Sequence, residues 1–106
     1  MRPFASLRRK ADFARLRSRG RRFATPHLTF FRSEAGALDT QSLVGISVSK
    51  SVGTAVVRNR VRRRLAACLQ DHLSGDSRMR LLISARPSAA AATYEALCEQ
   101  VRRAIA

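Results

Sequence analysis

The hydrophobic positions of this chain repeat with two different periods, and the changes between them outline its elements. Residues 27–34 and 43–49 alternate apolar side chains with polar or small ones, which is typical of strands that bury one face. Residues 81–85 are mostly apolar and predict a strand inside a sheet. A shorter strand is expected around residues 22–24.

Three further segments place apolar side chains three or four positions apart, which is the period of an α-helix. The first covers residues 11–19 and ends at Gly20. The second follows Thr54, a residue suited to cap a helix N-terminus, and continues to residue 72. The third covers residues 93–105, with acidic side chains near its start and arginines near its end, as the helix dipole prefers.

Short connections join these elements. Residues 35–42 suit a hairpin loop, residues 50–53 form a turn, and Gly75 with Asp76 marks another loop. The order of elements, α-β-β-β-α-β-α, predicts an α+β fold in which a small mixed four-stranded sheet packs with three helices. We expect a single domain over residues 1–106.

The first half of the second helix carries a dense run of charge. Five arginines fall within seven residues, Arg58-Asn59-Arg60-Val61-Arg62-Arg63-Arg64. An apolar stripe is nevertheless kept, so this helix is predicted to pack on a core while it presents guanidinium groups outward. Guanidinium groups pair with phosphate oxygens in a planar, bidentate way, which makes nucleic acid the expected partner. A solvated helix face without a partner is the alternative, although the arginines would then repel one another unrelieved.

The whole composition agrees with a polyanionic partner. Lys and Arg number 21 against 7 Asp and Glu, a net charge of +14. No apolar run is long enough to span a membrane, and no apolar segment of a signal peptide follows the basic N-terminus, so we expect a cytoplasmic protein that binds no membrane. Residues 1–9 are expected to be a flexible basic arm with Phe4 as its anchor. Cys68 and Cys98 form no CxxC pair and are expected to be reduced, in or near the core, and to form neither a disulfide nor a metal site.

The surroundings of the arginine run resemble the bacterial ribonuclease P protein subunit. That family carries a strand of the type G-hydrophobic-S-V-S-K-K, which is similar to Val44-Gly45-Ile46-Ser47-Val48-Ser49-Lys50 here. An R-N-R helix follows in the family, as it does in Arg58-Asn59-Arg60-Val61-Arg62-Arg63. The resemblance extends to Leu7-Arg8-Arg9, Asp12-Phe13, Gly20 and Ala85-Arg86-Pro87.

Three positions depart from the family pattern. Ser51 replaces a second lysine, Arg17 stands where a second aromatic residue is often found, and Arg80 stands where an acid often precedes the last strand. These departures concern local contacts, because the strand and the R-N-R helix are both retained.

The resemblance implies both a topology and a function. It implies a left-handed β-α-β crossover, although general rules favour a right-handed one. It implies the accessory subunit of a ribonucleoprotein endoribonuclease that removes the 5′ leader from precursor tRNA, with one protein per RNA. Catalysis would belong to the RNA and its Mg²⁺, and the protein alone would bind no cofactor and no small-molecule ligand.

The resemblance also implies two sets of binding residues. The catalytic RNA would contact the R-N-R helix at Arg58, Asn59, Arg60, Arg62, Arg63 and Arg64. The leader would lie in a cleft formed by Arg9, Phe13, Arg17, Phe31, Ser47 and Lys50. For Asn59 a plain surface position is the alternative.

Strand alternation gives the leader site a physical basis. It puts Phe30 on one face of the sheet and Phe31 on the other, with Gly45 and Ser47 beside Phe31. We expect the first face to cover the core and the second to form an open platform on which bases stack. Packing of Phe31 in the core is the alternative, and for Phe13 a cleft role and a helix-to-sheet core role are equally open.

No catalytic constellation accompanies this pattern. His27 and His72 are isolated, and no carboxylates are paired for general acid–base work. The alternative to the ribonuclease P subunit is a ribosomal or general RNA-binding protein with no catalytic complex. A DNA-binding regulator is a third hypothesis, although a helix that reads the major groove more often mixes Asn, Gln and Ser with its arginines.

Overall fold

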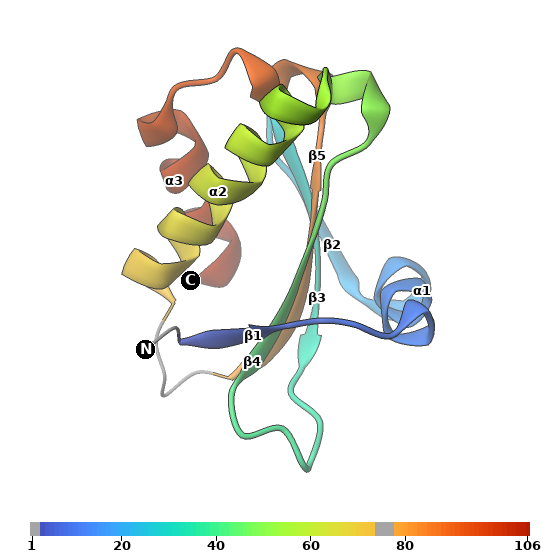
Figure 1. Cartoon of the computed structure of the whole chain (residues 1–106). Helices are drawn as coiled ribbons and strands as arrows, with labels where there is room; N and C mark the ends of the chain where they lie inside the picture. The colour runs from blue at the N-terminus through green and yellow to red at the C-terminus, as the bar shows by residue number, and fades with distance from the viewer. Residues whose placement is uncertain (1–2, 74–77) are drawn as a thin grey trace.

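The computed structural model describes residues 3–73 and 78–106 and contains a mixed sheet with helices on both faces (Figure 1). The strands are β1 (Phe4–Ser6), β2 (Arg21–Ala24), β3 (Leu28–Glu34), β4 (Ser42–Ser47) and β5 (Met79–Ala85), in the spatial order β1-β4-β5-β3-β2. The helices are α1 (Lys10–Arg19), α2 (Ala55–His72) and α3 (Tyr94–Ile105), and 3₁₀ turns cover Lys50–Val52 and Pro87–Ala90. The predicted α+β class is confirmed, whereas the loop predicted at Gly75 and Asp76 lies outside the described residues.

The prediction of a flexible arm and of only four strands was wrong. Residues Phe4–Ser6 form β1, which pairs in parallel with the first half of β4. Phe4 is 3% exposed and Leu7 is 6% exposed, so two apolar side chains anchor this segment and not one. A strand of three residues is too short to show alternation, and its partner lies far away in the sequence, so neither local pattern nor spacing could reveal it.

The sheet separates two apolar layers of unequal size. The larger core lies between the sheet and the pair α2 and α3, and it includes Leu28 and Phe30 of β3. On the other face, which α1 covers, Leu16 packs with Leu82, and Phe31 lies against them (Figure 1). The predicted division of β3 into two faces is therefore confirmed.

The arginine-rich helix begins where the sequence indicates. The Thr54 side chain accepts a hydrogen bond from the Val57 N–H at 3.4 Å and caps the helix. Val61, Leu65 and Leu69 are buried against the sheet, which leaves Arg63 exposed and Arg62 and Arg64 half-buried.

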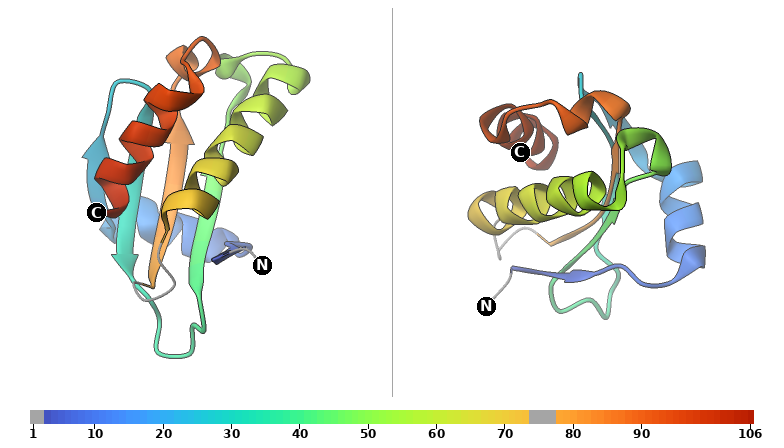
Figure 2. Two further views of the ribbon diagram at one scale, coloured as in Figure 1. Left: turned by 90° about the vertical axis from the view of Figure 1, so that its left-hand side faces the viewer. Right: turned by 45° about the horizontal axis from the view of Figure 1, so that its top comes forward.

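The unit β4-α2-β5 joins two adjacent parallel strands. In the left view of Figure 2, α2 lies in front of the sheet and the chain passes from β4 on the right to β5 on the left, with both strands running upward. This is a left-handed crossover, as the family resemblance implied and against the general preference.

The two cysteines are core residues, as predicted, but the prediction that they are reduced was wrong. Cys68 of α2 and Cys98 of α3 are joined as a disulfide, with their Cα atoms 5.1 Å apart. That Cα separation suits a disulfide, and it arises because α2 and α3 pack side by side on the same face. Helical periodicity places each cysteine on a buried stripe but does not say which helices become neighbours.

Candidate nucleic-acid interface

The second half of β4 is an unpaired edge of the sheet. β1 pairs only with Ser42, Leu43 and Val44, so Gly45–Ser47 of this strand have no strand beside them on that side. A hollow of about 360 Å³ lies here, between β4, the β1 segment and α2. Its lining combines apolar side chains with two cations, namely Phe4, Leu7, Val44, Ile46, Arg62 and Arg63. We call it the β4-edge hollow.

Gly45 brings α1 against this strand. A Cβ atom at Gly45 would lie 2.6 Å from Cε1 of Phe13, closer than real Cβ contacts come, so only glycine leaves room for the ring. Phe13 also lines the β4-edge hollow, where it forms the wall contributed by α1. Glycine inside a strand is a sequence signal for such a close approach. Sequence reasoning placed Gly45 on the sheet face but missed this role.

Arg17 contacts two other residues predicted to bind the leader. Its guanidinium carbon lies 5.9 Å from the centroid of the Phe31 ring, and its Nη2 donates to the Ser47 Oγ at 3.5 Å. The cation therefore covers the aromatic ring that strand alternation predicted to be exposed. An open platform on this face was a wrong prediction, because α1 crosses it and leaves Phe31 half-buried.

The structure brings Phe13, Arg17, Phe31 and Ser47 together but leaves the two other predicted leader contacts at the margins. Arg9 is the exposed residue that precedes α1, and its carbonyl accepts the Asp12 N–H. Lys50 is exposed in the 3₁₀ turn that follows β4. Arg9 therefore lies at the start of α1, which carries Phe13 and Arg17, and Lys50 lies after β4, which carries Ser47.

The arginines of α2 fall into two groups according to what they contact. Arg62 and Arg63 line the β4-edge hollow, and Nη1 of Arg62 donates to Oδ1 of Asn59 at 2.9 Å. Asn59 is exposed and so orients a guanidinium that faces the hollow. Arg58 is half-buried, and its buried Nε has no hydrogen-bond partner among the described residues.

Arg60 and Arg64 point instead toward the segment that precedes α3. Arg64 Nη1 donates to the Ala92 carbonyl at 3.2 Å, and Arg60 Nη2 reaches the Ala90 carbonyl at 3.5 Å. Arg64 is part-buried, whereas Arg60 is exposed. Part of the charge that the sequence assigned to RNA therefore stabilises a helix–loop contact, which no pattern in the sequence indicates.

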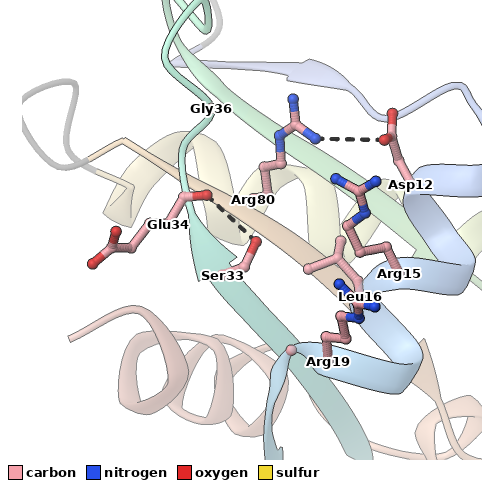
Figure 3. Close-up of a pocket in the computed structure, with 9 residues that line it drawn as sticks. Asp12, Arg15, Leu16, Arg19, Ser33, Glu34, Gly36 and Arg80 are labelled. Atoms are coloured by element: carbon pink, nitrogen blue, oxygen red, sulfur yellow. Dashed lines mark hydrogen bonds and ion pairs between the residues drawn. The ribbon is translucent and has the colours of Figure 1, made fainter.

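Arg80, one of the departures from the family pattern, forms an ion pair with Asp12 near the start of α1 (Figure 3). Its Nε lies 2.9 Å from Oδ2 of Asp39, its Nη2 lies 3.2 Å from Oδ1, and its Nη1 lies 3.4 Å from Asp12. The bidentate Arg80 guanidinium holds the pKa of the Asp39 carboxyl below its ordinary value, and the Gly36 N–H acts in the same direction. This network fixes the loop between β3 and β4 to β5 and to α1.

The remaining candidate residues form no reactive group. His27 is less isolated than expected, because its Nδ1 lies 2.8 Å from the Ser88 Oγ, but that contact joins the turn before β3 to the turn after β5. Within residues 3–73 and 78–106, no three His, Cys, Asp or Glu side chains gather closely enough to hold a metal ion. None of the helices in these same residues has the length and apolar character needed to cross a membrane.

Comparison with known proteins agrees with this geometry. The family model for ribonuclease P matches residues 1–106. The ribonuclease P protein component of Acidothermus cellulolyticus is 37% identical over 98 residues, which cover 92% of this chain and 82% of that protein. The solved ribonuclease P protein of Staphylococcus aureus is 26% identical with a TM-score of 0.82, over 92% of this chain and 89% of that one. The ribonuclease P protein of Thermotoga maritima, 16% identical with a TM-score of 0.78 over 94% of each chain, shares the fold. Sequence match, identity and fold all agree, so this chain belongs to the ribonuclease P protein family.

Proposed function

We propose that this chain is the accessory protein of an RNA-based endoribonuclease that removes the 5′ leader from precursor tRNA. One protein binds one catalytic RNA through α2, and the single-stranded leader lies along the open edge of β4. The RNA and its Mg²⁺ perform the cleavage, while the protein positions the leader. The protein works in the cytoplasm, where precursor tRNA is made.

One observation carries this proposal: the β4-edge hollow has an apolar floor and cationic sides. Arg62 and Arg63 line one side, and Phe13 of α1 forms another, with Arg17 one helical turn farther along α1. A single strand offers a continuous row of phosphates and exposed bases, so cations along both sides with aromatic rings between them suit it. Little in such a surface reads base identity, which fits a leader of variable sequence.

Reconstitution tests the proposal directly. Purified protein added to ribonuclease P RNA and precursor tRNA at low Mg²⁺ is expected to stimulate leader removal, whereas the protein without the RNA is expected to cleave nothing. RNA binding without any stimulation would favour a general RNA-binding protein. Cleavage by the protein alone that is lost on mutation of one acid or histidine would overturn the assignment of catalysis to the RNA.

The place of the leader is tested by Phe13→Leu, which removes the aromatic ring that lines the β4-edge hollow but keeps most of the apolar volume. The affinity for precursor tRNA is expected to fall by about 1–3 kcal/mol if a base stacks on this ring. The affinity for mature tRNA, which has no leader, is expected to stay the same, and so is the affinity for the catalytic RNA. Such a swap changes stability by less than about 1.5 kcal/mol, so the melting temperature serves as the control. Normal leader binding by a variant that melts much earlier would make Phe13 a core residue only.

A further inference from the structure

A second basic surface lies at the edge of the sheet opposite the β4-edge hollow. β2 forms that edge, and all four of its residues are exposed. Two adjoining hollows, of about 420 and 180 Å³, share Arg21, Arg32 and Ala106 between β2, β3 and the end of α3. Arg19 completes the first and Arg103 the second. Figure 2 shows the C-terminal end of α3 beside β2 and β3, far from the open half of β4.

The charges of this β2–α3 surface are poorly matched within the protein itself. Arg21 and Arg32 are directly opposite each other in the β2–β3 ladder, an arrangement that destabilises a sheet when the charges are alike. Arg32 donates to the Ala104 and Ala106 carbonyls through Nη1, at 3.1 and 3.3 Å. The side chains of Arg19, Arg21 and Arg103 form no hydrogen bond or ion pair with any of the residues that the structure describes. Glu34, at the far side of the larger hollow, is the acid that lines it.

An aromatic ring lies among these arginines. Phe23 is 38% exposed, and its ring centroid lies 6.2 Å from that of the buried Phe30. Strand alternation puts Phe23 on the same face of β2 as Arg21, and both line the smaller hollow. A half-exposed phenylalanine held against the core, two residues from an unpaired guanidinium, offers a stacking surface beside a phosphate-binding group.

We propose that the β2–α3 surface is a second binding site for single-stranded RNA, in which a base stacks on Phe23 and the adjacent phosphate pairs with Arg21 and Arg103. It goes beyond the proposed function, which needs only α2 and the β4 edge. A phosphate bound between Arg21 and Arg32 would offset the repulsion between these two cations, which favours binding of an anion at this surface. RNA suits it better than an acidic peptide, because a carboxylate chain would use the arginines but leave the ring exposed.

Amide chemical shifts of the isotope-labelled chain, titrated with a short oligouridylate, test this site separately from the first. Amides of Arg21–Ala24 and of the last turn of α3 are expected to shift. Phe23→Ala is expected to weaken this response about five-fold or more, as the loss of one stacked base implies. Amides of β4 report the leader site independently. A response at β2 without one at β4 would leave this inference standing while the proposed leader site fails, and no shift at β2 would overturn the inference.

Arg21→Gln and Arg22→Gln form a matched pair, because they remove the same charge from neighbouring positions on opposite faces of β2. Arg21→Gln is expected to weaken the β2 response several-fold while the melting temperature stays the same or rises, since a like-charge pair is removed. Arg22→Gln is expected to change the response little. Equal weakening by both would show a diffuse charge effect and overturn the site. So would an equal response to a short polyglutamate, which has the charge but no bases.

Discussion

The division of the α2 arginines into two groups makes the sharpest prediction, for Arg63→Ala and Arg64→Ala. Both remove one charge from the same turn of the same helix. Arg63 is exposed and lines the β4-edge hollow, whereas Arg64 donates to the Ala92 carbonyl at 3.2 Å. If contacts decide the role, Arg63→Ala weakens RNA binding and Arg64→Ala mainly lowers stability.

The magnitudes follow from these contacts. One lost phosphate contact lowers the slope of log affinity against log salt by about 0.7–0.9. The affinity ratio of wild type to Arg63→Ala is therefore expected to fall by about three-fold between roughly 50 and 200 mM salt. Loss of the hydrogen bond from Arg64 is worth about 0.5–1.5 kcal/mol, which corresponds to a melting temperature lower by about 4–8 °C per kcal/mol. Arg64→Ala should leave the salt slope nearly unchanged.

The measurements are binding of the catalytic RNA at several salt concentrations and thermal melting of the free protein. Arg102→Ala, on the exposed side of α3 outside the R-N-R motif, is the control for loss of one charge. If all three variants flatten the salt dependence equally, RNA senses only the overall field of the protein and the sorting of arginines by contact is refuted. A normal melting temperature for Arg64→Ala would show that its bond to Ala92 contributes nothing.

Three other predictions concern the frame around the site. Asp39→Asn is expected to lower the free energy of unfolding by about 1 kcal/mol at neutral pH. Because Arg80 lowers the pKa of Asp39 in the folded protein, this loss of stability relative to wild type should shrink as the pH falls below the ordinary pKa of 3.8. A constant difference down to about pH 3 would contradict this. Gly45→Ala must displace the Phe13 ring, so it is expected to cost about 1–3 kcal/mol of stability and to weaken leader binding. Gly36→Ala, whose new methyl meets the Arg80–Asp39 pair outside the β4-edge hollow, is expected to lower stability without weakening leader binding. The disulfide between α2 and α3 closes a loop with a sequence separation of 30, worth roughly 3–4 kcal/mol in the chain-entropy model. Maleimide should label the unfolded chain only after reduction, and labelling without reductant would show free thiols.

Local patterns in this sequence predict elements well where the elements are long and periodic. The cap at Thr54, the buried stripe of α2 and the two faces of β3 all follow from spacing and residue type, because each depends on neighbours within the same element. The resemblance to ribonuclease P proteins added the left-handed crossover, because the general rule for β-α-β units predicts a right-handed one.

What could not be predicted depends on which elements become neighbours. β1 is too short for a pattern of its own, and the disulfide requires that α2 and α3 lie side by side. The platform expected around Phe31 is covered by α1, because alternation says which side chains share a face and not what packs on it. In α3, Gln100 lies on the buried stripe, where its Oε1 accepts from Thr25 at 2.6 Å, a partner 75 positions away. Each of these is a long-range contact, and no local rule selects it.

The open edge of β4 suggests why the arginines surround it. An unpaired strand edge with an apolar floor is a template on which another chain can add a strand, and proteins commonly guard such edges with charge. Here Arg17, Arg62 and Arg63 stand beside the edge, so a second copy of the chain, which also carries +14, is repelled. The same cations attract a polyanion. The groups proposed to bind RNA are thus the groups that keep the empty edge from pairing with protein.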